Sequence, residues 1–168
     1  MENKEGKHCL DDSPVVDYLE EFSELGKYIL GVGNGFQLLC EKGLLPGKLE
    51  KNSSGNFLCK QVFIKAENKH SVFTSDLKEE QVFTIPIATQ YGRYYAEEET
   101  LMQMRQDGQI LFRYCNYEGR ITEAVNFTGS LENIAVICNA KKNVFGMIPQ
   151  PERAVSRYFN DADGKEIL

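Results

Sequence analysis

The stretch Tyr28-Ile-Leu-Gly-Val-Gly-Asn-Gly-Phe-Gln37 decides the fold. Its first five residues, Tyr28 to Val32, are apolar along both faces, which predicts a strand covered on both sides within a parallel sheet. Gly33 and Gly35 then form a tight turn. A short helix is expected to follow from Phe36 to Lys42 and to end at Gly43. A strand, a glycine turn and a helix in this order indicate an α/β protein.

The segments on either side extend this pattern. Ser13 and Pro14 begin a predicted helix, and apolar residues recur in it at helical spacing until Gly26. Further along the chain, apolar runs bounded by turn residues predict strands and a hairpin. The expected strands are 57–65, 81–88, 110–116, 133–138 and 143–148, and the expected helices are 97–106 and 151–159.

Length and charge limit the classes of protein to consider. The chain has 168 residues and a net charge of −6. This length suits one domain, which we expect at 13–160 between a flexible tail at 1–12 and a second tail at 161–168. The acidic balance argues against a nucleic-acid partner. No apolar run approaches the roughly 20 residues of a membrane helix, and the charged N-terminus is unlike a signal peptide, so we expect a cytoplasmic protein without a membrane partner.

The glycine turn has two chemical interpretations. A dinucleotide-binding turn would need a third glycine at Phe36, which is too bulky, and an acidic residue after the next strand, whereas Glu50 lies in a predicted loop at 47–53. A nucleophile elbow needs a central side chain between two flanking glycines. Gly31 and Gly35 occupy the flanking positions, but the central residue is Gly33.

Several motifs resemble one known family. They are Gly31-Val-Gly-Asn-Gly-Phe-Gln37, Gly43-Leu-Leu-Pro-Gly47, Ile85-Pro-Ile-Ala88, Tyr94-Tyr-Ala96, Phe112-Arg-Tyr-Cys115, Gly129-Ser-Leu-Glu-Asn-Ile-Ala135 and Gly146-Met-Ile-Pro-Gln-Pro-Glu-Arg153. In this order and spacing, from about 13 to 155, the chain resembles the glutaminase subunits of phosphoribosylformylglycinamidine synthase. These are class I glutamine amidotransferases of purine biosynthesis. The resemblance implies a flavodoxin-like sheet flanked by helices, with an added β-rich segment.

The family's chemistry implies a Cys-His-Glu triad that releases ammonia from glutamine. Carried onto this chain, the nucleophile position falls on Gly33, the base position on Gln150 and the carboxylate position on Glu152. Only the last residue matches. Cys40 lies about 10 Å further along the helix and cannot replace Gly33. Cys115 could approach from another strand, but neither of the two histidines, His8 and His70, is placed to act as a base.

The resemblance also implies three strand–helix steps before Pro14, including the loop that forms the oxyanion hole. Only thirteen residues precede Pro14 here. The strand Tyr28 to Val32 is therefore expected to lack a neighbour, and an uncovered apolar edge favours aggregation. We expect a homo-oligomer, a second polypeptide or a rearranged sheet to cover it.

Other positions correspond to the family's substrate cleft, and each also has a structural explanation, such as turn chemistry or a polar helix position. The ligand-binding candidates are Gln37, Thr89, Asn126, Gly129, Ser130 and Arg153. An anion site would need Arg93, Arg113, Arg120 and Arg153 to converge. The five widely spaced cysteines contain no C-x-x-C pair, so we expect neither a metal site nor a cofactor.

Three hypotheses follow. The first is a catalytically inactive protein that acts by binding a synthetase, an intact glutaminase or itself. In the second, the vacated cleft binds a small ligand such as a nucleotide or an amino acid. The third is a residual glutaminase that supplies ammonia.

Overall fold

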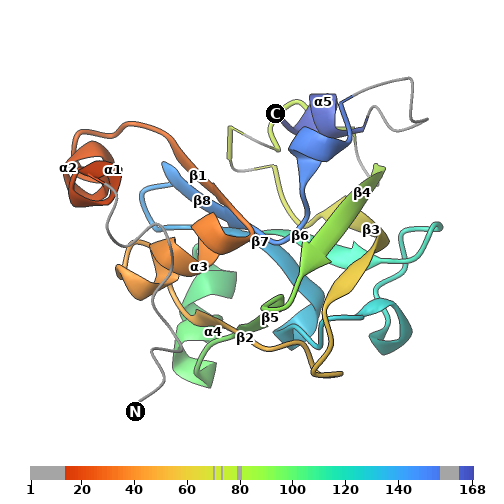
Figure 1. The fold of residues 1–168 in the computed structure, drawn as a ribbon. Helices are drawn as coiled ribbons and strands as arrows, with labels where there is room; N and C mark the ends of the chain where they lie inside the picture. Colours follow the sequence, from red (N-terminus) through yellow and green to blue (C-terminus); the bar gives the residue numbers. More distant parts are fainter. Residues whose placement is uncertain (1–13, 70, 73, 79–80, 156–162) are drawn as a thin grey trace, which may run out of the picture.

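The fold is a six-stranded mixed sheet with helices around it, in a computed structural model that describes residues 14–69, 71–72, 74–78, 81–155 and 163–168. The strand order is β1-β8-β7-β6-β3-β4 (Figure 1). The strands are β1 (Ile29–Val32), β3 (Leu58–Ala66), β4 (Val82–Thr89), β6 (Ile110–Cys115), β7 (Ile134–Cys138) and β8 (Val144–Met147). The short strands β2 (Lys48–Glu50) and β5 (Arg93–Tyr95) form a separate antiparallel pair.

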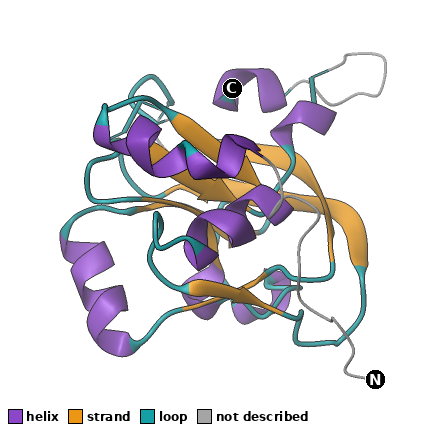
Figure 2. Cartoon of the chain, turned by 60° about the vertical axis from the view of Figure 1, so that its left-hand side comes forward, coloured by secondary structure: helices purple, strands orange, loops and turns teal. Residues whose placement is uncertain are grey.

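Helices lie on both sides of the twisted strand layer (Figure 2). They are α1 (Pro14–Asp17), α2 (Leu19–Glu24), α3 (Asn34–Glu41), α4 (Glu98–Gln106), α5 (Gly164–Ile167) and the 3-10 helices η1 (Glu123–Val125), η2 (Leu131–Asn133) and η3 (Pro151–Arg153). Figure 1 places α1 and α2 at the left-hand margin of the molecule. None of the helices in the described segments is both long and apolar enough to span a membrane.

The core lies where strands from both halves of the chain meet. Every residue of β6, β7 and β8 is buried. Phe36 of α3 stacks on Tyr94 of β5 at 6.0 Å between ring centroids, so the small sheet is packed against the helix that follows the glycine turn. Aromatic pairs of this kind stabilise a core beyond their buried area. The expected fold class, a sheet flanked by helices with an added β-rich segment, is confirmed.

The sheet differs from the expected parallel environment of the first strand. In the part of the chain that the structure describes, β1 and β8 are the one parallel pair, and every other pair in the six-stranded sheet is antiparallel. Among the described residues, β1 has β8 as its one neighbour and lies at the sheet edge. Its residues are mostly half-buried rather than covered on both faces, because one side of the strand has no neighbour. Its apolar run alone predicted the wrong environment.

Three further expectations are corrected. The predicted loop at 47–53 contains β2, whose partner β5 is distant in sequence. The predicted helix 151–159 is only the three-residue η3 up to Arg153, and 156–159 lie outside the described residues. The expected C-terminal tail includes α5, where Ile167 is 3% exposed and Asp163 accepts a hydrogen bond from the Thr84 amide at 2.7 Å. The expected N-terminal tail lies outside the described residues.

Candidate active-site elbow

The turn between β1 and α3 has the backbone of an elbow. Gly33 has φ 54° and ψ −110°, in the left-handed region that ordinary residues rarely occupy. Its amide donates to the Met147 carbonyl at 2.9 Å, and its carbonyl accepts from the Gln37 amide at 3.2 Å. The chain therefore turns sharply from strand to helix at the position expected of a nucleophile, but Gly33 offers no side chain.

Close packing explains the glycines around this turn. A Cβ on Gly31 would lie 2.5 Å from Leu39 Cδ1 and 2.7 Å from the Gly35 carbonyl oxygen. On β8, a Cβ on Gly146 would overlap the ring of Phe36. Such contacts are too short for any side chain. These two glycines let α3 lie directly against β1 and β8.

Gln150 lies opposite Gly33. A Cβ on Gly33 would be 3.8 Å from Gln150 Nε2, an ordinary van der Waals distance, and nothing else would lie within 4 Å. Gln150 is held by its own amide, which donates to the Pro86 carbonyl at 2.8 Å. The structure thus brings together two of the three positions carried over from the family, with room for a side chain between them.

Two amide oxygens in this region lack partners. Gln150 Oε1 and Gln37 Oε1 are both inaccessible to solvent and accept no hydrogen bond from the described residues. Gln37 lies one turn along α3 from Gly33, and its Nε2 donates to Glu41 at 2.9 Å. Buried acceptors without donors are uncommon, because each loses its hydration. The region therefore has unused capacity to accept hydrogen bonds.

The third position carried over from the family, Glu152, lies in a different environment from Gly33 and Gln150. Glu152 lies in η3 and is exposed, as is Arg153. Neither side chain has a hydrogen bond or an ion pair with the described part of the chain. A three-residue 3-10 helix also provides little dipole to favour Glu152. The carboxylate position is therefore present without a partner to orient.

The remaining ligand-binding candidates lie in a group of packed loops. We call this group the loop assembly, and it comprises Asn52, Ser53, Thr89, Gly92 and 126–130. Asn126 Oδ1 accepts from the amides of Gly129 and Ser130 at 3.1 and 3.0 Å, and its Nδ2 donates to the Ser130 carbonyl at 2.6 Å. Ser130 Oγ donates to the Ile134 carbonyl at 2.6 Å. Thr89 Oγ1 accepts from the Tyr91 amide at 3.1 Å. These polar groups stabilise turns, which favours the structural explanation of the candidates.

Asn52 joins these loops and was missed in the sequence. It is 2% exposed, and its Nδ2 donates to the carbonyls of Thr89 and Asn56, both at 2.8 Å. Its Oδ1 accepts from the Gly92 amide at 3.0 Å. The adjacent Ser53 packs against Gly129 and donates its amide to the Thr128 carbonyl at 2.9 Å. The only sequence signal was the turn-like Asn52-Ser-Ser-Gly55, which does not reveal burial.

The four arginines considered for an anion site do not converge. Arg93 pairs with Glu50 at 3.5 Å, and Arg120 pairs with Glu118 at 3.3 Å. Arg113 is buried and is bound by Glu67 at 3.0 Å and Glu132 at 3.1 Å. Their charges are already balanced by nearby carboxylates, and Arg153 lies apart in η3.

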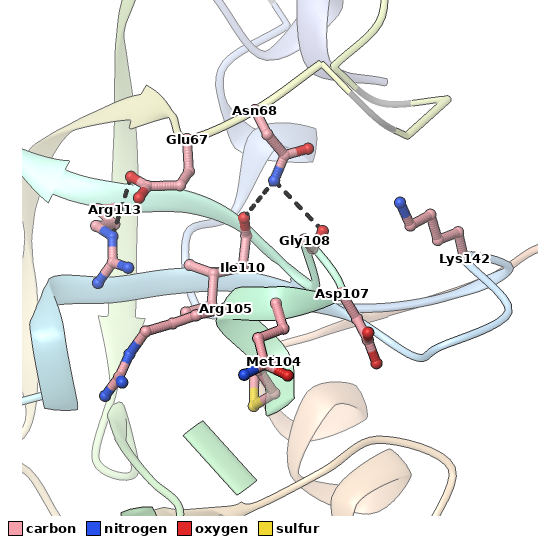
Figure 3. A pocket seen from close by; sticks show the side chains of 10 residues that line it. Glu67, Asn68, Met104, Arg105, Asp107, Gly108, Ile110, Arg113 and Lys142 are labelled. Carbon is pink, nitrogen blue, oxygen red and sulfur yellow. Dashed lines mark hydrogen bonds and ion pairs between the residues drawn. The ribbon is translucent and has the colours of Figure 1, made fainter. Parts of the chain in front are cut away.

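A hollow of about 570 Å³ lies beside Arg113, away from the elbow (Figure 3). Asn68 Nδ2 crosses its wall and donates to the carbonyls of Ile110 at 2.7 Å and Gly108 at 3.3 Å. Arg113 and Glu67 pair on the same wall. The hollow shares no lining residue with the elbow, and several of its polar groups are already bound to each other or to nearby side chains. It gives no indication of a catalytic role.

None of the buried thiols is activated. Burial raises the pKa of Cys40 to about 12 and the pKa of both Cys115 and Cys138 to about 11. These thiols therefore stay protonated near neutral pH and are poor nucleophiles. His8 and His70 fall outside the described residues, so no imidazole is placed near the elbow by the residues that are described. Those residues also contain no cluster of His, Cys, Asp and Glu suited to a metal ion.

Comparison with known proteins agrees with this geometry. The family described as the CobB/CobQ-like glutamine amidotransferase domain matches residues 6–166. Phosphoribosylformylglycinamidine synthase subunit PurQ of Aquifex aeolicus is 47% identical over 152 residues, covering 90% of this chain and 67% of that protein. The same subunit of Synechocystis is 44% identical, covering 90% of this chain and 68% of that protein.

A solved structure points the same way. The structure of PurLQS from Thermotoga maritima matches with a TM-score of 0.76 and 37% identity, covering 91% of this chain and 64% of the matched chain. The present chain thus spans about two thirds of the length of these relatives. The sheet with its glycine elbow, the matched sequence and the matched structure agree: the chain belongs to the CobB/CobQ-like glutamine amidotransferase family.

Proposed function

We propose that this chain is a catalytically inactive relative of the purine-biosynthesis glutaminase subunit and that it acts by binding or assembly. The observation that carries the proposal is the elbow. Its backbone at Gly33 has the strained shape that presents a nucleophile, yet the residue has no side chain and faces Gln150 instead of a base. Thiol attack on a glutamine amide needs both a thiolate and a proton carrier.

The three buried thiols do not supply the missing nucleophile. Cys40 is held in the core, with its Sγ 3.9 Å from the Pro46 carbonyl oxygen, and a raised pKa keeps it protonated. Cys115 and Cys138 are 1% and 0% exposed. A substrate could not reach them without opening the sheet. These properties argue against the residual glutaminase hypothesis.

The relatives suggest the kind of partner. They are named as subunits of a synthase, and the matched structure is of PurLQS. By this similarity, the chain is expected to join a synthetase, an intact glutaminase or a second copy of itself. The half-covered strand from Tyr28 to Val32, with its open edge, is the proposed contact region.

An ammonia-release assay with glutamine tests the loss of activity. The wild-type chain should give no more ammonia than a sample without protein, both alone and mixed with the purified synthetase subunit of a PurQ relative. Release above that background would overturn the proposal. Size-exclusion chromatography of the same mixture tests assembly, and a strict monomer that joins neither the synthetase nor an intact PurQ would contradict a binding role.

A second candidate function is small-ligand binding at the vacated elbow. The observation in its favour is the pair of unpartnered acceptors, Gln37 Oε1 and Gln150 Oε1, beside a glycine with open space. A ligand with amino or amide hydrogens would satisfy them. Thermal-shift measurements with glutamine, nucleotides and purine intermediates test this function. Stabilisation by one of them that Gln150→Ala abolishes would support it, and no stabilisation by any would exclude it.

A further inference from the structure

Two consecutive residues of η2, just before β7, have a left-handed backbone. Glu132 has φ 50° and Asn133 has φ 59°, and Lys142 is the one further non-glycine residue with positive φ in the described part of the chain. Asparagine tolerates this conformation, whereas glutamate is sterically disfavoured in it. Such strain persists only where the surrounding structure holds it. The contacts of η2 must therefore compensate for its strain.

Two arginines from different elements bind the Glu132 carboxylate. Arg105 of α4 donates from Nε and Nη2 to Oε1 at 3.1 and 2.5 Å. Arg113 of β6 donates from Nη1 to Oε2 at 3.1 Å and to the backbone carbonyl of Glu132 at 2.5 Å. Figure 3 shows both arginine side chains on one side of the hollow. The strained residue is therefore held through its side chain and through its backbone.

The two arginines differ in their access to solvent. The Arg113 side chain is 11% exposed, pairs with Glu67 at 3.0 Å and belongs to a strand with neighbours on both sides. The Arg105 side chain is 39% exposed, and its second partner, Glu98, is 77% exposed. Burial by itself would raise the pKa of Glu132, but hydrogen bonds from both arginines hold it below its usual value. One exposed ion pair contributes little, whereas a carboxylate bound by two arginines is a stronger link.

The strained η2 turn is joined directly to the loop assembly. Asn133 is 6% exposed, and its Nδ2 donates to the carbonyls of Tyr114 at 3.2 Å and Thr122 at 2.7 Å. Its backbone amide donates to the Ser130 carbonyl at 3.3 Å. Asn126 Nδ2 donates to the Ser130 carbonyl at 2.6 Å and to Asn133 Oδ1 at 3.4 Å. A change in the η2 turn would therefore break bonds on which the loop assembly depends.

We propose that Glu132 is an ion-pair clamp: Arg105 and Arg113 hold the η2 turn in its left-handed conformation, and this turn keeps the loop assembly closed. Opening of the clamp would release Asn126 and Ser130, two of the ligand-binding candidates, from the hydrogen bonds that now occupy them. Because the Arg105 side of the clamp is exposed, dissolved ions weaken it. This inference goes beyond the proposed function and holds whichever partner or ligand the chain binds.

Hydrogen exchange of the whole native chain measures the clamp. The amides of Gly129 and Ser130 donate to Asn126 Oδ1 and report on the loop assembly. The Gly33 amide, bonded to β8, reports on the elbow. Glu132→Ala should speed the exchange of the Gly129 and Ser130 amides at least ten-fold and that of the Gly33 amide less than two-fold. Local opening exposes only the amides of the unit that opens.

A second variant separates the clamp from the backbone strain. Glu132→Asn removes the carboxylate and its reach to the arginines, but asparagine suits a left-handed backbone. The Gly129 and Ser130 amides of this variant should still exchange at least five-fold faster than in the wild type. Glu98→Ala is the matched control, because it removes one exposed partner of Arg105 and leaves the Glu132 contacts in place. It should change the same exchange rates less than two-fold.

Salt gives a readout that a change in packing alone would not alter. Raising NaCl from about 0.05 M to about 1 M should speed the exchange of the Gly129 and Ser130 amides at least three-fold more in the wild type than in Glu132→Ala. If Glu132→Ala does not fold, Arg105→Ala takes its place, because it removes the exposed arginine alone, and it should speed the same exchange at least three-fold.

Four outcomes would overturn the inference. They are wild-type exchange of the loop assembly in Glu132→Ala or its replacement, wild-type exchange in Glu132→Asn, an equal salt response with and without the carboxylate, and equal acceleration of the Gly129, Ser130 and Gly33 amides. The second would assign the strain, and not the clamp, to the control of these loops. The last would show that Glu132 contributes only to global stability.

Discussion

The elbow and the loop assembly both lie within family-like sequence, yet they use their polar side chains in different ways. In the loop assembly, the amide groups of Asn52 and Asn126 are hydrogen-bonded at both their nitrogen and oxygen atoms. At the elbow, the oxygens of Gln37 and Gln150 accept nothing from the described residues. The motifs of the loops are therefore explained by folding, because a buried polar group without a partner costs stability. The side-chain oxygens of Gln37 and Gln150 make no such contribution to stability, so folding does not explain them.

The largest effect is expected from packing beneath the elbow. Gly31→Ala should lower the free energy of unfolding by about 3 kcal/mol or more, because the added methyl would meet the Gly35 backbone and Leu39. Urea denaturation measures it. Gly35→Ala is the matched control, since its Cβ would have nothing within 4 Å, and it should change stability by less than about 1 kcal/mol. Equal stability of the two variants would show that the turn does not need its close contact.

The second prediction compares a side chain of the loop assembly with one at the elbow. Asn52→Ala removes three hydrogen bonds to the backbone, two of them buried, and should cost about 2–3 kcal/mol of unfolding free energy. Gln150→Ala removes a side chain whose oxygen has no partner and should cost less than about 1 kcal/mol. Chemical denaturation of both variants checks the difference. If Gln150→Ala lost more unfolding free energy than Asn52→Ala, the side chains of the loop assembly would not be the more stabilising ones.

A smaller loss is expected at the centre of the elbow. Gly33→Cys should destabilise by about 1–2 kcal/mol, because a side chain is strained at φ 54° although space is available. The new thiol would lie at the first turn of α3, where the helix dipole favours a thiolate. At pH 8 it should react with iodoacetamide faster than Cys40, Cys115 and Cys138. Gly33→Ala should show the same loss of stability without any labelling beyond that of the thiols already present, such as the exposed Cys59, and a Gly33→Cys variant whose new thiol stays unreactive would argue against an elbow.

The smallest effect concerns the buried thiols at alkaline pH. Their folded pKa values of about 11 or 12 are raised by burial, so their contribution to stability is fully present below the unfolded pKa and is lost as pH rises toward these values. Cys138→Ala should reduce the decline of unfolding free energy between pH 9 and 11 by about 1 kcal/mol per pH unit. Cys59→Ala, at an exposed thiol, should leave the decline unchanged. The same slope in both variants would refute the effect of burial.

The sequence could predict the elements that follow local patterns, but not those that depend on contacts between distant segments. Strands β3, β4, β6, β7 and β8 follow local apolar patterns, and their predicted positions agree with the structure within one or two residues. Pro86 fits because β4 is an edge strand. β2 was missed because it is three residues long and depends on β5, more than forty positions away. Asn52 was missed because the sequence does not show that distant loops bury it.

The sequence by itself determined the order of strands and helices, the glycine turn and the absence of a side chain at Gly33, because these depend on residue identity and local spacing. The tertiary structure alone decided which groups are paired, exposed or buried. Long-range pairing chose β8 as the neighbour of β1, turned Val15, Phe22 and Leu25 outward and buried Cys40, Cys115 and Cys138. A periodic apolar pattern records that a residue avoids water, but not whether its own chain or a partner covers it.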